Sequence, residues 1–232
     1  MRPLYLSALT AMLLTMMPAH AALITYSDSA SFSAATTSLT SIGFTGEAPV
    51  NGLKDFSTST GYQISGVTFV GYVTASSYSL HINDSGFSTP YWNFGTGAVL
   101  SSPIYDRAAG AALPYIRVTF PANITAFSTD LMTVSPNALT FQVAAQGSTF
   151  SVATANRPTQ TFFGITSDVP FSYVDFTVAG TSLNGSTFGL VDNVQFGQAT
   201  PPVMEGATFV LMGGGLLALG VFRKRLRRLN PA

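Results

Sequence analysis

The chain contains no cysteine among its 232 residues. Disulfide bonds, cysteine-based zinc sites and thiol catalysis are therefore excluded, and the fold must be stabilised by its apolar core alone. Charged residues make up only 9% of the sequence, which is low for a cytosolic globular protein. Ser, Thr, Gly, Ala and aromatic residues take their place, a composition common in exported β proteins.

Basic residues are scarce in the body of the chain. Between residues 22 and 198, four Lys and Arg stand against nine Asp and Glu, which gives a net charge of −5. Nucleic-acid recognition begins with a basic patch, so we expect no nucleic-acid partner. An acidic body suits solubility or the binding of divalent cations.

The N-terminus has the features of a secretory signal peptide. Arg2 gives a positive start, an apolar run follows, and small residues stand at Ala19 and Ala21. This pattern predicts export by the Sec machinery and removal of residues 1–21 by signal peptidase. The alternative is an N-terminal membrane anchor.

Residues 22–197 show short apolar runs, often alternating, separated by Gly, Pro, Asn and Ser. In the stretch 115–120, for example, Ile116, Val118 and Phe120 share one face. Regularly spaced short strands without long helical periods predict an all-β fold, an antiparallel β-sandwich of jelly-roll-like or immunoglobulin-like type. A short helix is expected soon after residue 26, capped by Ser27 or Asp28.

A short linker at 198–202, which ends in two prolines, leads to an apolar segment at 203–222. Twenty residues form a helix of about 30 Å, which just spans the hydrocarbon core of a bilayer. The basic tail 223–228 should remain in the cytoplasm by the positive-inside rule. The sequence therefore predicts a single C-terminal transmembrane helix.

This C-terminus resembles the PEP-CTERM sorting signal of Gram-negative bacteria. The apolar segment and the Arg-rich tail match that family, whereas the Pro-Glu-Pro motif is represented by Met204, Glu205 and Gly206, with the glutamate in place and both prolines missing. The basic part of the signal consists of Arg223, Lys224, Arg225, Arg227 and Arg228. Stretches such as "IRVTFPANITAFSTDL" and "FGLVDNVQFG" resemble the bodies of proteins in the same family.

The resemblance implies a precursor anchored in the inner membrane, processed by an exosortase-like sorting protease and delivered to the cell envelope or extracellular matrix. It implies a non-catalytic protein associated with exopolysaccharide or biofilm. The alternative for the tail is a permanent membrane anchor. The alternative for the body is a lectin-like carbohydrate-binding module whose jelly roll is stabilised by calcium.

Catalytic residues are hard to find in the body, and we assign none. His81 is the only histidine after residue 21, and we expect it on the surface or in a turn. Glu47 is the only glutamate between residues 22 and 198, and most aspartates fall where turns are expected. A polysaccharide hydrolase, which needs a pair of placed carboxylates, is therefore the least supported class.

Two groups of residues are candidates for binding. Asp192 lies inside an apparent strand, where a carboxylate needs a partner or a cation, so Asp192 with Glu47 is a candidate structural calcium site. Backbone hydrogen bonds at Asp192 are the alternative, and no other cofactor is expected. Tyr91, the single Trp92 and Asn93 form a candidate carbohydrate-binding loop, unless Trp92 folds back to plug one end of the sandwich.

Overall fold

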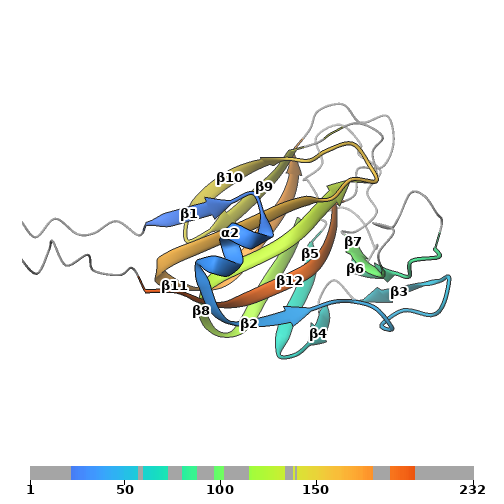
Figure 1. The fold of residues 1–232 in the computed structure, drawn as a ribbon. Coiled ribbons are helices and arrows are strands. Elements are labelled where there is room, and N and C mark those ends of the chain that lie inside the picture. The colour runs from blue at the N-terminus through green and yellow to red at the C-terminus, as the bar shows by residue number, and fades with distance from the viewer. Residues whose placement is uncertain are drawn as a thin grey trace, which may run out of the picture. The chain divides into compact units, whose positions relative to one another are not determined.

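The computed structural model describes residues 22–56, 60–72, 80–87, 97–101, 115–133, 138, 140–179 and 189–201. Most of these residues lie in antiparallel strands, which confirms the all-β prediction (Figure 1). The strands are β1 Leu23–Tyr26, β2 Thr36–Ile42, β3 Leu53–Phe56, β4 Tyr62–Ile64, β5 Val67–Tyr72, β6 Leu80–Asn83, β7 Val99–Ser101, β8 Tyr115–Thr133, β9 Thr140–Ala145, β10 Ser148–Ala153, β11 Thr161–Ala179 and β12 Gly189–Ala199.

The only helix within the described ranges is α2, Ser29–Ala34. Asp28 caps it, because its carboxylate accepts a hydrogen bond from the Ser31 N–H at 2.8 Å, and this bond lowers the pKa of the carboxyl. Phe32 is the one buried residue of the helix. No helix in the described part of the chain is long and apolar enough to cross a membrane, and the predicted helix 203–222 lies outside that part.

Two long strands, β8 and β11, lie in the middle of a single 12-stranded sheet. Their antiparallel pairing shifts register between Thr166 and Phe171 and again before Tyr173. Pro170 lies in this interval, and a proline nitrogen has no hydrogen to donate to the neighbouring strand. The regular ladder is therefore interrupted, and an irregularity of this kind lets a strand bend.

Each long strand consequently belongs to two layers. In layer A, the first half of β8 pairs with β5 and the second half of β11 pairs with β9, which in turn pairs with β10. In layer B, the second half of β8 pairs with β12 and the first half of β11 pairs with β1. β2 and β7 pair with β12 and continue layer B.

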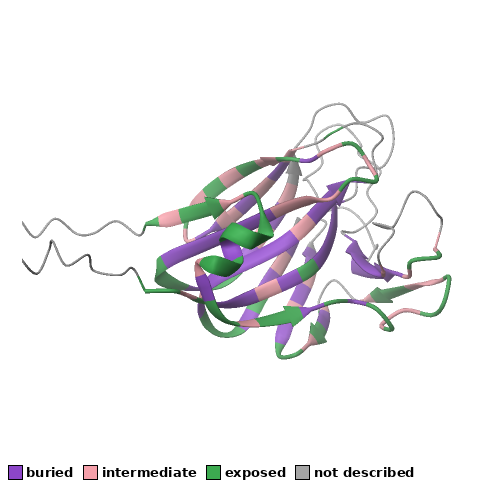
Figure 2. Ribbon diagram, viewed as in Figure 1, coloured by how far each residue is buried: buried purple, intermediate pink, exposed green. Residues whose placement is uncertain are grey.

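Aromatic side chains join the two layers. Phe127 of layer B lies against Phe176 of layer A, with ring centroids 5.7 Å apart. Both residues are at most 2% exposed and belong to one core cluster. Buried residues occur along the strands of both layers (Figure 2). Burying one such side chain contributes about 1.5–3 kcal/mol to the free energy of unfolding. Aromatic packing therefore stabilises this fold, which contains no disulfide bonds. Two sheet layers around one apolar core form a β-sandwich, as the sequence predicts.

Residues 1–199 form one compact unit and residues 200–232 form a second. Strand β12 continues through Gln198 and Ala199, which pair with Thr37 and Thr36 of β2. The last strand therefore extends two residues beyond the predicted boundary at 197. The reason is that Gln198 and Ala199 have hydrogen-bond partners on the strands at either side of β12. They pair with β2, and each also forms a hydrogen bond with the Thr125 side chain of β8.

Candidate functional site

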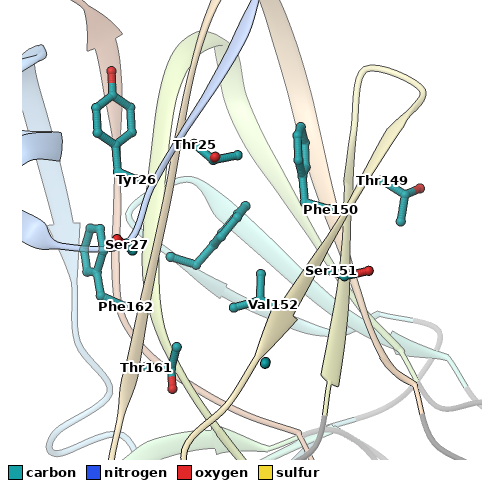
Figure 3. Close-up of a pocket in the computed structure, with 11 residues that line it drawn as sticks. Thr25, Tyr26, Ser27, Thr149, Phe150, Ser151, Val152, Thr161 and Phe162 are labelled. Atoms are coloured by element: carbon teal, nitrogen blue, oxygen red, sulfur yellow. The ribbon is translucent and has the colours of Figure 1, made fainter.

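A groove lies at the open edge of the sandwich, where β10 of layer A faces β1 and the start of β11 in layer B (Figure 3). Its volume is about 550 Å³, in the range of pockets that hold small organic ligands. We call it the edge groove. Its lining residues are Thr25, Tyr26, Ser27, Thr149, Phe150, Ser151, Val152, Ala153, Thr161, Phe162 and Phe163.

Strand alternation in β10 determines which side chains enter the groove. Phe150 and Val152 point inward, whereas Thr149 and Ser151 point to the other side of the strand (Figure 3). The Phe150 ring lies 6.1 Å from that of Phe163, which is only 4% exposed. The interior of the groove is therefore aromatic and packed onto the main core.

The opposite wall is β1, which is held against β11 by several contacts. The Tyr26 ring meets Phe32 edge-on at 5.8 Å, and its hydroxyl shares a hydrogen bond with the Thr166 hydroxyl at 3.1 Å. At the start of the strand, the Ala22 N–H donates to the Asp168 carboxylate at 2.8 Å. These contacts fix the strand from which Thr25 enters the groove.

None of the eleven lining residues carries a charge. The rings of Phe150 and Phe163 lie together on the groove side, whereas the rings of Tyr26 and Phe162 pack against Phe32 on the other side of β1 and β11 (Figure 3). Five further lining residues are Ser or Thr. Such a surface offers apolar faces and neutral hydroxyl groups, and provides no general acid, base or nucleophile activated by a neighbouring base.

A second group of side chains lies on the outer face of layer A. Arg117 and Asp175 are opposite each other on β8 and β11 and form two hydrogen bonds of 2.7 Å. The Arg117 guanidinium also lies 4.5 Å from the centroid of the Tyr173 ring. This ring is 42% exposed, so a fixed cation holds an exposed aromatic side chain.

Asp192, the candidate metal ligand, is 5% exposed and lies in β12 beside Asp130 of β8. Its carboxylate accepts the Asn193 N–H at 2.7 Å, and the Asn193 side chain donates to Asp130 at 2.8 Å. Burial raises the pKa of the Asp192 carboxyl to about 6, with the Asp130 carboxylate adding to the rise. The backbone hydrogen bond that the sequence offered as the alternative is present.

Glu47, the other candidate ligand, lies beside a different side chain. Together with burial, its carboxylate raises the pKa of the Tyr62 phenol. Asp130, and not Glu47, is the carboxylate that acts on Asp192. No group of three or more His, Asp or Glu side chains in the described ranges is arranged to hold a metal ion.

Two expectations about titratable residues are wrong. His81 is 2% exposed in β6, with its Nδ1 3.7 Å from an Asp55 carboxylate oxygen, and is neither on the surface nor in a turn. Asp130, Asp168 and Asp175, for which turns were expected, lie in strands, whereas Asp192 lies in a strand as predicted. Aspartate is tolerated there because neighbouring strands supply Arg117 for Asp175, and a bulge supplies Asn193 for Asp130.

Several predicted site residues lie outside the described ranges. These are the aromatic loop residues Tyr91, Trp92 and Asn93, and the sorting-signal residues Met204, Glu205, Gly206, Arg223, Lys224, Arg225, Arg227 and Arg228. The predicted signal peptide, residues 1–21, also lies outside them.

The edge groove was missed by sequence reasoning. Alternation in the stretch 148–153 shows that Phe150 and Val152 share a face, but not what that face meets. The opposite wall comes from Thr25, more than 100 residues earlier in the chain. Nothing in a local pattern signals that these two edge strands lie across from each other.

No family model and no curated protein matches the sequence. Solved structures with some likeness include a variant of CBM29-2, described as probing ligand recognition by family 29 carbohydrate-binding modules, at 13% identity and a TM-score of 0.36 over 72% of this chain and 100% of that one. A structure described as a family 29 carbohydrate-binding module has 13% identity and a TM-score of 0.31 over 73% of this chain and 97% of that one. At such low TM-scores these likenesses carry no argument about fold or ligand.

Proposed function

We propose that this protein is an exported, non-catalytic component of the cell envelope or extracellular matrix, and that its β-sandwich binds neutral polysaccharide in the edge groove. The observation that carries the proposal is the chemistry of the groove, in which aromatic rings and hydroxyl groups line about 550 Å³ without a single charge.

Saccharides match both parts of this lining. The C–H faces of a sugar ring are apolar and pack on an accessible aromatic ring such as that of Phe150, while sugar hydroxyls exchange hydrogen bonds with Thr and Ser side chains. Polyanionic ligands are disfavoured, because the body from residue 22 to 198 carries a net charge of −5 and the groove offers no cation.

A non-catalytic role follows from the same lining. Hydrolysis of a glycosidic bond needs a general acid and a second carboxylate on either side of the bond. No Asp or Glu is among the residues that line the groove. Binding without turnover is therefore the chemistry that this surface supports.

Three finer points belong to the same proposal. The sandwich is of jelly-roll type, on the basis of its two antiparallel layers joined through β8 and β11. Signal peptidase releases the body, and an exosortase-like protease processes the tail at Met204, Glu205 and Gly206, on the basis of sequence resemblance. A calcium ion at Asp192 recruits Asp130 in place of Glu47, because Asp130 is the neighbouring carboxylate.

Two matched variants of β1 test the groove. Thr25 points into the groove, and Ile24, its neighbour on the strand, is 55% exposed and is not part of the lining (Figure 3). Thr25→Arg and Ile24→Arg place the same charged side chain at neighbouring positions of the same strand, where successive side chains point in opposite directions.

We expect full-length protein in detergent to be retarded in native gels that contain a soluble neutral polysaccharide, with glucan, mannan and xylan tested separately. Thr25→Arg should abolish the retardation and Ile24→Arg should preserve it, both variants having a wild-type circular dichroism spectrum. Equal retardation of the two variants would place binding outside the groove. Release of reducing sugar from any of the polymers would contradict the non-catalytic role.

A further inference from the structure

The outer face of layer A continues the edge groove around strand β10. Thr149 and Ser151 line the groove and yet point to the outer side of the strand (Figure 3). On that side Ser151 exchanges hydrogen bonds with Gln142 of β9, at 3.0 and 3.2 Å. The polar rim of the groove is therefore also the border of the outer face.

The same face leads to the exposed ring of Tyr173. Thr149 pairs with Ala144 of β9, and Ala144 pairs with Asp175 of β11, two residues from Tyr173. Two strand spacings separate β10 from β11, a distance of about 10 Å. A ligand that leaves the groove over β10 thus needs to cross only β9 to reach the ring.

The side chains around Tyr173 are arranged to hold the ring and not to bind ions. Arg117 and Asp175 neutralise each other through two hydrogen bonds of 2.7 Å. The guanidinium lies 4.5 Å from the centroid of the ring, and the residue is still 42% exposed. The neighbouring position on β8 is occupied by Thr119, which is neutral and exposed.

We propose that a polysaccharide chain runs from the edge groove across β10 and β9 and stacks on Tyr173, so that the ligand is the interior of an extended neutral polymer and not a terminal sugar. This inference rests on the proposed function of the groove. Continuity of the two surfaces through Thr149 and Ser151 supports it, and so does their shared lack of net charge.

The dependence of affinity on oligosaccharide length distinguishes this proposal from binding in the groove alone. Titration calorimetry with neutral oligosaccharides of increasing length, cut from the polymer that retards the protein best, should show affinity that rises after the groove is filled. Tyr173→Ala should lower affinity for the longest oligosaccharides about tenfold and leave that for the shortest ones unchanged. Tyr173→Trp, which keeps a stacking ring, should restore the dependence on length.

Val169→Ala is the matched control, because Val169 is a similarly exposed apolar residue of β11 that lies within the first register shift, between Thr166 and Phe171. It should bind all lengths as the wild type does. If affinity is independent of length and Tyr173→Ala has no effect, this inference is wrong and the groove proposal stands. If Tyr173→Ala weakens short and long ligands equally, Tyr173 supports the fold and the inference is again wrong. If no saccharide binds the wild-type protein, both proposals are wrong.

Discussion

Replacing Asp192 by asparagine should make the protein more stable at neutral pH. The carboxyl is 5% exposed, and burial raises its pKa from an ordinary 3.8 to about 6. A carboxyl whose pKa is higher in the folded state contributes stability below pH 4, where both states are protonated. That contribution is lost as the pH rises through 6, because the folded protein must then hold a buried charge.

The magnitude follows from the two pKa values. A difference from 3.8 to about 6, at about 1.36 kcal/mol per pKa unit, corresponds to about 3 kcal/mol. Asp192→Asn keeps the oxygen that accepts the Asn193 N–H and removes the charge. We therefore expect the variant to gain up to about 3 kcal/mol in free energy of unfolding at pH 8 and nothing at pH 3.5.

Denaturation by urea at a series of pH values, followed by far-ultraviolet circular dichroism, measures this gain. Thr133→Val is the control, because the Thr133 hydroxyl is buried without a hydrogen-bond partner. Removing it should stabilise by about 1 kcal/mol at every pH. A pH-independent effect of Asp192→Asn, or a loss of stability at pH 8, would refute the argument from burial.

The same titration tests calcium at this site. A bound ion stabilises only the folded state, by about 2.7 kcal/mol at a hundredfold excess over its dissociation constant. Calcium should then raise the melting temperature of the wild type at pH 8 and not that of Asp192→Asn. Identical melting curves with calcium and with chelator would mean that no calcium binds here. The surroundings of the Asp192 carboxylate would then be the Asn193 N–H and the neighbouring Asp130 without an ion.

Three further predictions concern the backbone and the chain ends. In thermal melts, Gly61→Ala should destabilise the protein far more than Gly147→Ala. Both glycines have a positive φ (66° and 75°), where alanine costs about 1 kcal/mol. Only at Gly61 would the new Cβ also collide with a neighbour, the Phe69 carbonyl oxygen. Cleavage after residue 21 turns the amide that contacts Asp168 into an ammonium, so Asp168→Asn should lower the melting temperature of the mature protein more than that of the uncleaved precursor. Mass spectrometry of protein from its native host should show loss of the tail, and restoring prolines on both sides of Glu205 should speed that loss; an intact C-terminus found only in membranes would mean a permanent anchor.

Local patterns were sufficient for the fold class and for some details. Alternation predicts that Ile116, Val118 and Phe120 share one face, and in the structure all three are at most 5% exposed. The short helix after residue 26 is capped by Asp28 as expected. These features depend on neighbours within a few residues, which the sequence displays directly.

Partners from distant strands could not be predicted in this way. Asp175 looks like a turn residue until Arg117, 58 residues away, is placed opposite it. His81 is buried because its strand, β6, lies between β7 and β3 in the 12-stranded sheet. The local composition around His81 does not show this strand order. The edge groove has the same origin, since its walls are contributed by β1 and β10.

The bends in β8 and β11 connect the fold to the proposed function. A single strand, β11, runs through Pro170 from Thr161 to Ala179. Its first half pairs with β1 and its second half pairs with β9, which carries β10. A straight β11 would place β1 and β9 one after the other along the same edge of one flat sheet, with β10 beyond β9, so that β1 and β10 could not face each other. Because the strand changes layer at the bulge, these two edges face each other and enclose the groove, while Tyr173, just after the bulge, comes to lie on the outer face. One interruption of strand pairing thus creates both surfaces on which we propose that the polysaccharide binds.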